Sequence, residues 1–144
     1  FTSNQGWNLA VDRDRLIPII QRLKDHGIRV SLFMDADSTQ MPFAQEIGAD
    51  RVELYTEPYA TAFREDRVES VFQRYVDAAQ VAQAVGLGVN AGHDLNLHNL
   101  EKFCSIPKIL EVSIGHALIA EALDMGLSNT VKAYLKILSQ TPEK

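Results

Sequence analysis

The chain has 144 residues, of which 46% are hydrophobic and 23% are charged, a composition typical of one ordinary globular domain. Its net charge of −5 argues against a nucleic-acid-binding surface, because such surfaces need clustered Lys and Arg. The single cysteine, Cys104, excludes an internal disulfide framework, and no apolar run or signal-peptide pattern indicates a membrane span or secretion, so we expect a cytoplasmic protein.

The first predicted element is a helix over residues 12–25, with Asp12 as its expected N-cap and an apolar stripe along one face. A strand follows over residues 28–35, an apolar and β-prone run that begins after Gly27. Together these segments form the first unit of a pattern that recurs along the chain.

The same order of helix, glycine and strand then repeats. Further strands are predicted over residues 51–56, 87–93 and 109–115, and further helices over residues 38–47, 65–85, 97–105 and 127–139. Gly27, Gly48 and Gly86 each stand between a helix and a strand, where the end of a helix favours a left-handed residue.

Strands that alternate with helices at this spacing predict a parallel α/β fold. An open doubly wound sheet is the alternative, but the glycine fingerprint of its nucleotide-binding forms is absent. A TIM (β/α)8 barrel takes about 250 residues, so four units are about half of one. Because the chain starts at Phe1 in a polar, turn-like stretch, we expect residues 1–144 to be the C-terminal portion of a single barrel domain whose N-terminal portion is missing.

Polar residues at the carboxyl ends of the strands are the first candidates for a functional site, because these ends form the ligand mouth of a parallel β/α fold. They are Asp35 and Asp37 after the first strand, Glu53, Tyr55 and Thr56 at the second, Asn90, His93 and Asp94 at the third, and Ser113, Gly115 and His116 at the fourth.

Glu53 shares a face with Arg51 and Tyr55, opposite Val52 and Leu54, which predicts that its carboxylate points into the barrel interior. An unpaired charge is costly in such a place. The carboxylate therefore either pairs with an inward Arg or Lys from the missing portion or serves as an acid, a base or a charge-stabilising group.

His93 ends the third strand, on the face of Val89 and Ala91, and the preceding Gly92 is expected to leave space for a substrate. A histidine exchanges protons near neutral pH. His93 is therefore either a hydrogen-bonded structural residue or a catalytic one.

Gly115 and His116 open a short helix after the last strand. The N-terminus of a helix binds anions, and barrels commonly bind phosphate at this place, although an ordinary turn with a glycine is the alternative. Cys104 is expected in the core beside Phe103. No lysine stands at a strand end, so a Schiff-base lysine is not expected in this part of the chain. No local metal-ligand spacing occurs and no metal is expected, with a site assembled from several strands as the alternative.

Four segments closely resemble the family of pyridoxine 5′-phosphate synthases. They are RVSLFMDAD at 29–37, VELYTEPYA at 52–60, GLGVNAGHDLNLHNL at 86–100 and EVSIGHALIAEAL at 111–123. The resemblance covers nearly the whole chain in the right order and implies strands five to eight of the family's barrel, with residues 1–9 matching the mobile loop after strand four.

The resemblance implies the condensation of 3-amino-2-oxopropyl phosphate with 1-deoxy-D-xylulose 5-phosphate to pyridoxine 5′-phosphate, phosphate and water, without a cofactor. It implies that His93 is the general acid that helps water leave, and that Glu53 stabilises positive charge along the path to the imine. It also implies that Thr2, Gly115 and His116 contact substrate, the last two by holding phosphate. The family forms octamers, which implies a homo-octamer, with the helix over 65–85 as a contact element.

Two departures from the family pattern concern the site. Asp94 stands where the family has a glycine that contacts phosphate, which implies a contact through the backbone N–H with the carboxylate turned away. Tyr55-Thr56-Glu57 stands where the family has histidine, threonine and glycine, which alters the local polar network.

Two other functions compete with this interpretation. One is a different phosphate-binding barrel enzyme, an aldolase or an isomerase, and the other is a non-catalytic phosphate-binding module. The presence of both Glu53 and His93 argues against the loss of catalysis.

Overall fold

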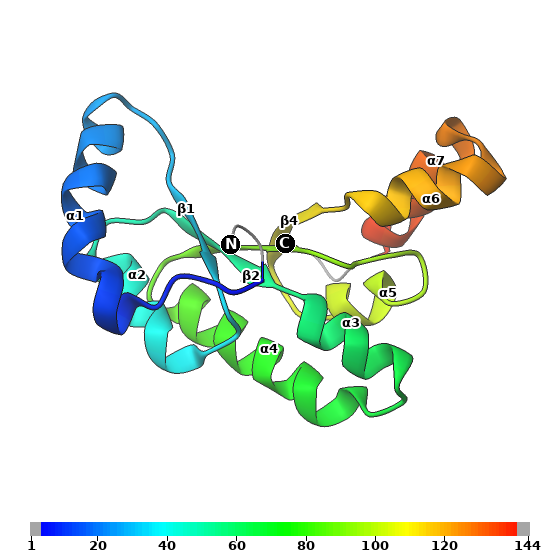
Figure 1. Cartoon of the computed structure of the whole chain (residues 1–144), viewed down its shortest axis with the longest axis horizontal. Helices are drawn as coiled ribbons and strands as arrows, with labels where there is room; N and C mark the ends of the chain where they lie inside the picture. The colour runs from blue at the N-terminus through cyan, green and yellow to red at the C-terminus, as the bar shows by residue number, and fades with distance from the viewer. Residues whose placement is uncertain (1–3, 141–144) are drawn as a thin grey trace.

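A four-stranded parallel sheet with the strand order β1-β2-β3-β4 forms the centre of the computed structural model, which describes residues 4–140 (Figure 1). The strands are β1 (Ser31–Met34), β2 (Arg51–Tyr55), β3 (Gly88–Gly92) and β4 (Ile109–Ser113). Each strand pairs with the next strand in the sequence, and the segments that connect them contain the helices. The predicted parallel α/β architecture is confirmed, and it is compatible with part of a TIM barrel.

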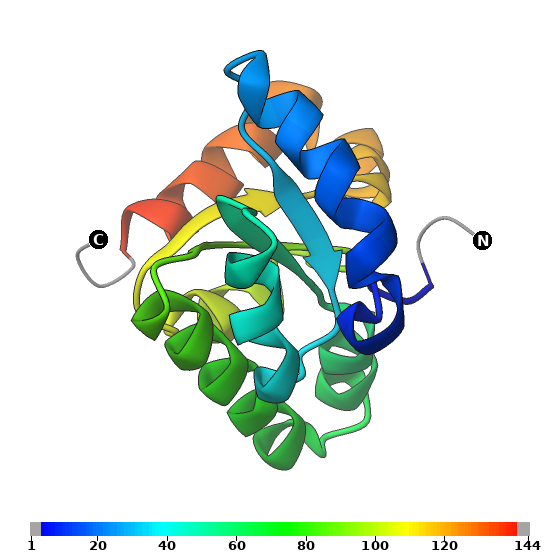
Figure 2. The ribbon, with the colours of Figure 1, turned by 90° about the vertical axis from the view of Figure 1, so that its left-hand side faces the viewer.

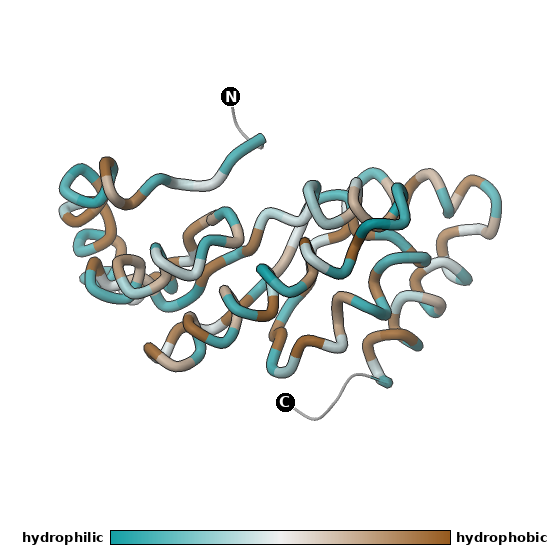
Figure 3. Tube along the Cα trace, turned by 90° about the horizontal axis from the view of Figure 1, so that it is seen from below, coloured by the Kyte–Doolittle hydropathy of each residue, from teal (hydrophilic) through white to brown (hydrophobic). Residues whose placement is uncertain are grey.

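The helices connect the strands and flank the sheet (Figure 2). They are α1 (Leu9–Asp25), the 3-10 turn η1 (Ser38–Gln40), α2 (Met41–Glu46), α3 (Glu57–Arg64), α4 (Val68–Ala84), α5 (Leu100–Cys104), α6 (His116–Met125) and α7 (Leu127–Ser139). α1 and α2 lie at one end of the molecule and α6 and α7 at the other (Figure 1). Hydrophilic and hydrophobic positions alternate along these helices (Figure 3), as an amphipathic layer requires.

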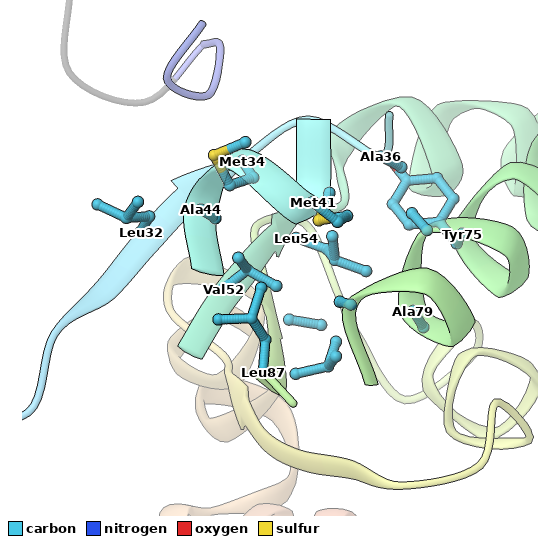
Figure 4. Close-up of a cluster of buried hydrophobic side chains, with 14 of the residues drawn as sticks. Leu32, Met34, Ala36, Met41, Ala44, Val52, Leu54, Tyr75, Ala79 and Leu87 are labelled. Carbon is cyan, nitrogen blue, oxygen red and sulfur yellow. The ribbon is translucent and has the colours of Figure 1, made fainter. Parts of the chain in front are cut away.

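The apolar core lies between the sheet and the helices that follow β1 and β2. Val52 and Leu54 are completely buried there, and Met34 is 1% exposed. Their side chains face α2 and α4, from which Met41 and Tyr75 pack against them (Figure 4). One face of the sheet is therefore apolar, which leaves the opposite face for polar chemistry.

The start of α1 differs from the prediction. The helix begins at Leu9, and the side chain of Asn8 caps it by accepting a hydrogen bond from the backbone N–H of Ala10. Asp12 lies inside the first turn and pairs with Arg15 at 2.9 Å, so the expected N-cap was wrong. Asn and Asp are equally good caps, and the complete burial of Leu9 selects the earlier start.

α3 was not predicted. It begins at Glu57, directly after β2, with Pro58 in its first turn, where the fixed φ of proline fits a helix. A turn at Asp66, with a φ of 53°, separates it from α4. The left-handed φ predicted for the three glycines that precede strands is confirmed, with values of 70°, 92° and 89° at Gly27, Gly48 and Gly86.

Candidate active site

Glu53 lies in the middle of β2, on the sheet face opposite the apolar core. Its register partners are Phe33 on β1 and Asn90 on β3, and paired residues of parallel strands share a face. Because Val52 and Leu54 on either side are buried in the core, the predicted alternation along β2 is confirmed. Within residues 4–140 the carboxylate of Glu53 forms neither a hydrogen bond nor an ion pair.

The carboxylate of Glu53 lies over Gly92. A Cβ atom at position 92 would stand 2.3 Å from Oε1 of Glu53 and 3.1 Å from the Cβ of Ser113. The space that Gly92 was expected to leave for a substrate is thus occupied by the side chain of Glu53. The glycine allows the carboxylate to reach the end of the strands.

Arg51, the cation on the same face of β2, is engaged by other partners. Its Nη1 lies 2.7 Å from Oε1 of Glu111 and donates to Oδ1 of Asn90 at 3.1 Å, while Nδ2 of Asn90 donates to Oε2 of Glu111 at 3.2 Å. This network crosses three strands beside Glu53 and leaves Glu53 unneutralised. The network was not predicted from the sequence, although Arg51 was expected on the same face of the strand as Glu53.

His93 follows the last residue of β3, where the backbone turns into the left-handed region with a φ of 87°. Val89 and Ala91 are completely buried in the apolar core, whereas the imidazole ring of His93 lies 4.8 Å from the ring of Phe33. The expectation that His93 shares the face of Val89 and Ala91 is therefore wrong. The positive φ breaks the alternation of the strand and places the imidazole on the face that carries Glu53.

The imidazole of His93 keeps one buried nitrogen without a partner. Nδ1 has no hydrogen bond within the part of the chain that the structure describes. The ring stands edge-on to Tyr55 at 5.3 Å. Burial, with contributions from the Glu57 and Asp94 carboxylates, raises the pKa of Tyr55, which therefore stays neutral near pH 7. Buried polar atoms are nearly always satisfied in proteins, so this nitrogen is an exception.

Asp94, Gly115 and His116 come together beside this histidine. Gly115 is the N-cap residue of α6 and His116 its first residue, and Nε2 of His116 lies 3.3 Å from Oδ1 of Asp94. The carboxylate of Asp94 thus reaches toward the N-terminus of α6, although the resemblance implied that it turns away from the phosphate. The side chain of His116 is 77% exposed and remains accessible.

Hydrogen bonds hold the loop between β3 and α5 against α6. The backbone N–H of Leu97 donates to Oε1 of Glu121 on α6 at 3.2 Å, and the hydroxyl of Tyr134 on α7 donates to Oε2 of the same carboxylate at 2.5 Å. Within the loop, Nδ2 of Asn99 donates to the carbonyl of Asp94 at 3.0 Å. These bonds fix the loop relative to α6 and were not foreseen from the sequence.

Two clefts open at this end of the sheet. The first, of about 550 Å³, is lined by Gln5, Gly6, Trp7, Asn8, Asp12, Arg15, Phe33, Asp35 and Gln40. The second, of about 430 Å³, is lined by Asp94 and His116 together with residues of α3 and of the loop after β3. Thr2, the remaining predicted contact residue, lies outside the residues that the structure describes.

Cys104 is 3% exposed, and burial raises the pKa of its thiol to about 11, as expected for a core residue rather than a nucleophile. The described residues contain no group of three or more His, Cys, Asp or Glu side chains that could hold a metal ion. Among residues 4–140 no helix is both long and apolar enough to cross a membrane.

Comparison with known proteins gives a consistent result. The family described as "Pyridoxal phosphate biosynthesis protein PdxJ" matches residues 1–140. The chain is 54% identical over 141 residues to the pyridoxine 5′-phosphate synthase of Albidiferax ferrireducens, which covers 97% of this chain and 56% of that protein.

Two further relatives carry the same name. The synthase of Xanthomonas campestris pv. campestris is 50% identical over 139 residues, which are 96% of this chain and 54% of the relative. The synthase of Cytophaga hutchinsonii is 49% identical over 140 residues, 96% of this chain and 58% of the relative. The chain thus spans about half the length of the curated relatives it matches, and it belongs to the PdxJ family of pyridoxal phosphate biosynthesis proteins.

Proposed function

We propose that this chain supplies strands five to eight of a single (β/α)8 barrel, and that the protein is a pyridoxine 5′-phosphate synthase. The reaction joins 3-amino-2-oxopropyl phosphate to 1-deoxy-D-xylulose 5-phosphate and releases pyridoxine 5′-phosphate, phosphate and water. The family membership and the four consecutive parallel strands support this proposal. No cofactor, nucleic acid or membrane has a part in it.

The observation that carries the proposal is the placement of Glu53 and His93 on one face of the sheet. The carboxylate of Glu53 has no counter-ion among the described residues, so it favours the positive charge that develops as the substrate amine condenses with a carbonyl. His93, whose ring lies on the same face of the sheet, donates a proton to the departing hydroxyl as a general acid. The substrate brings its own amine, so no protein nucleophile is required.

Phosphate binding is assigned to the N-terminus of α6. The first backbone N–H groups of this helix have no partner within it, and the positive end of the helix dipole lies there. Gly115 and His116 present these groups, and Asp94 contributes its backbone N–H while its carboxylate is held by His116. Thr2 is assigned a substrate contact on the resemblance alone.

A homo-octamer in the cytoplasm completes the proposal. The large apolar side chains that are most exposed lie on α1, α6 and α7 and beside them, and none of them is on α4 among the described residues. They are Trp7, Val11, Ile17, Ile19, Ile28, Ile119, Leu123, Met125, Leu127, Val131 and Leu135. Subunit contacts through α6 and α7 are therefore favoured over the contact through residues 65–85 that the sequence suggested.

Activity of the protein at its natural full length, measured with both phosphorylated substrates, tests the function. His93→Ala is expected to lower kcat by about 10²- to 10⁴-fold, the usual contribution of a general acid. Glu53→Gln, which keeps the size of the side chain, is expected to lower kcat with little change in KM. His26→Ala changes an exposed histidine just after α1, Glu46→Gln changes an exposed glutamate at the end of α2, and both serve as matched controls.

A His93→Ala enzyme with full activity would remove the mechanism. An unmodified protein that binds phosphate but forms no pyridoxine 5′-phosphate would instead support the non-catalytic module, and activity on a different phosphorylated sugar would support an aldolase or isomerase.

A further inference from the structure

Thr56 joins the end of β2 to the end of β3. It is completely buried, and its backbone N–H donates to the carbonyl of Gly92 at 2.9 Å. Its hydroxyl contacts two carbonyl oxygens of the neighbouring strand end, that of Gly92 at 2.6 Å and that of His93 at 2.5 Å. The last residues of the two strands are thus held together through one threonine.

The hydroxyl of Thr56 does not cap the helix that begins after it. Thr56 is the N-cap residue of α3, where a threonine side chain ordinarily accepts a hydrogen bond from the first turn of its own helix. No such bond is formed here, and the hydroxyl is directed to β3 instead. α3 therefore goes without a side-chain cap so that the end of β3 is secured.

The end of β3 requires such support. His93 and Asp94 both have a positive φ, 87° and 58°, a strained conformation for a non-glycine residue that persists only where the surrounding structure holds it. The paired part of β3 ends at Gly92, so the carbonyl of His93 has no ladder partner. The Thr56 hydroxyl supplies the missing donor.

We propose that Thr56 is a positioning residue, whose hydroxyl holds His93 in the left-handed conformation that turns its imidazole away from the apolar core and toward Glu53. With ordinary alternation the imidazole would join Val89 and Ala91 on the core face. With the bond in place the ring lies against Phe33 and Tyr55. The inference rests on the proposed function for its kinetic consequence, but its structural consequence is independent of activity.

Thr56→Val removes the hydroxyl and keeps the shape, and Thr56→Ser restores the hydroxyl without the methyl group. In the protein at its natural full length, Thr56→Val is expected to lower kcat by about 10- to 100-fold, since a small displacement of a catalytic group has effects of this size. KM is expected to change much less, because no phosphate contact is lost. Thr56→Ser is expected to recover most of the rate.

The ring resonances of His93 give a second readout. Their NMR chemical shifts depend on the rings of Phe33 and Tyr55, so they are expected to move in Thr56→Val and to return in Thr56→Ser. Thr130→Val is the matched control, because Thr130 is also completely buried and also donates to a backbone carbonyl, that of Gly126 at 3.1 Å. It is expected to leave both kcat and the His93 shifts unchanged.

The proposal fails if Thr56→Val leaves the His93 ring shifts and kcat as they were, or if folded Thr56→Ser is as impaired as Thr56→Val, because the methyl group would then be the cause. Should Thr56→Val not fold, the comparison of Thr56→Ser with Thr56→Ala decides in the same way. An unmodified protein without synthase activity would refute the proposed function. The NMR chemical shifts of the His93 ring would still decide the role of Thr56.

Discussion

Gly92 and Glu53 occupy adjoining places at the centre of the candidate site. The absence of a side chain at position 92 lets the Glu53 carboxylate lie over the backbone of β3, close to Ser113. A methyl group there would meet the end of the flexible Glu53 side chain, which can rotate away, and would press on the Cβ of Ser113 at 3.1 Å, which needs only a small shift. The fold should therefore tolerate the change better than the chemistry does.

Gly92→Ala tests this relation. We expect a loss of kcat of at least about tenfold, because the carboxylate must leave its position, and a small change in the free energy of unfolding. Activity and denaturant unfolding, measured on the same preparation, check the two expectations.

Gly88→Ala is the matched control on the same strand. A Cβ at position 88 would stand 2.8 Å from Cδ1 of Leu110 and 2.9 Å from Cγ of Arg51, away from the Glu53 carboxylate. This variant should lose stability more than activity. Equal kcat values for Gly92→Ala and the unmodified protein would refute the relation.

The residues of the site were predictable to different degrees. The face to which Glu53 points was predicted from the alternation of side chains along a strand, because β2 is regular and Val52 and Leu54 on either side of Glu53 are buried apolar residues. The direction of His93 was predicted wrongly, because the alternation of side chains along a strand fails once the backbone adopts a positive φ, a conformation that is uncommon outside glycine and that was not considered at His93. The network of Arg51 with Glu111 depends on strand register, which the sequence does not specify.

At the scale of elements, the position of α6 depends on hydrogen bonds to the Glu121 carboxylate as well as on the apolar contacts of the helix. None of its residues is fully buried, and Glu121 connects the helix both to the loop after β3 and to Tyr134 on α7. Burial and the hydrogen bond to Glu121 raise the pKa of Tyr134, so its hydroxyl remains a donor at physiological pH. The orientation of the proposed phosphate site depends on this connection.

Tyr134→Phe removes the donor and keeps the ring. A hydrogen bond to a charged group contributes about 1.5 to 3 kcal/mol, so the free energy of unfolding should fall by an amount of this order. Amide hydrogen exchange within residues 116–125 should become faster, which mass spectrometry can follow. Asp124→Asn, at an exposed position of the same helix, should leave both unchanged. Unaltered exchange in Tyr134→Phe would show that the apolar contacts of α6 suffice.

Elements with a clear apolar period were predicted well. The helix over 127–139 has the predicted bounds, and α4 begins three residues later than predicted. α3 was missed because it is only eight residues long and follows β2 directly. The start of α1 was misplaced because Asn8 and Asp12 are both competent caps, and only the tertiary contact of Leu9 decides between them.

At the scale of the whole molecule, the exposed apolar side chains of α6 and α7 stand out. Leu123 is 84% exposed and Leu135 is 58% exposed. Surfaces of this kind mark contacts with other chains or other parts of the same protein. The proposed octamer gives them a partner.

Leu123→Glu should therefore disturb assembly in the protein at its natural full length. An exposed substitution ordinarily changes stability by no more than about 0.5 kcal/mol, whereas a charge buried in an interface costs several times more. Light scattering coupled to size exclusion should show a smaller assembly for Leu123→Glu and an unchanged one for Lys132→Glu, which places a carboxylate on a polar position of α7. An unchanged mass for Leu123→Glu would exclude α6 as a contact.

The order of the strands bears on how the polypeptide acquires its structure. Because each strand adds beside the one made just before it, pairing requires the closure of only one short intervening segment at a time, and the entropy lost in closing a loop grows with its length. Each completed unit can dock on its predecessor while the ribosome is still adding the next. Synthesis and folding can therefore advance in the same direction.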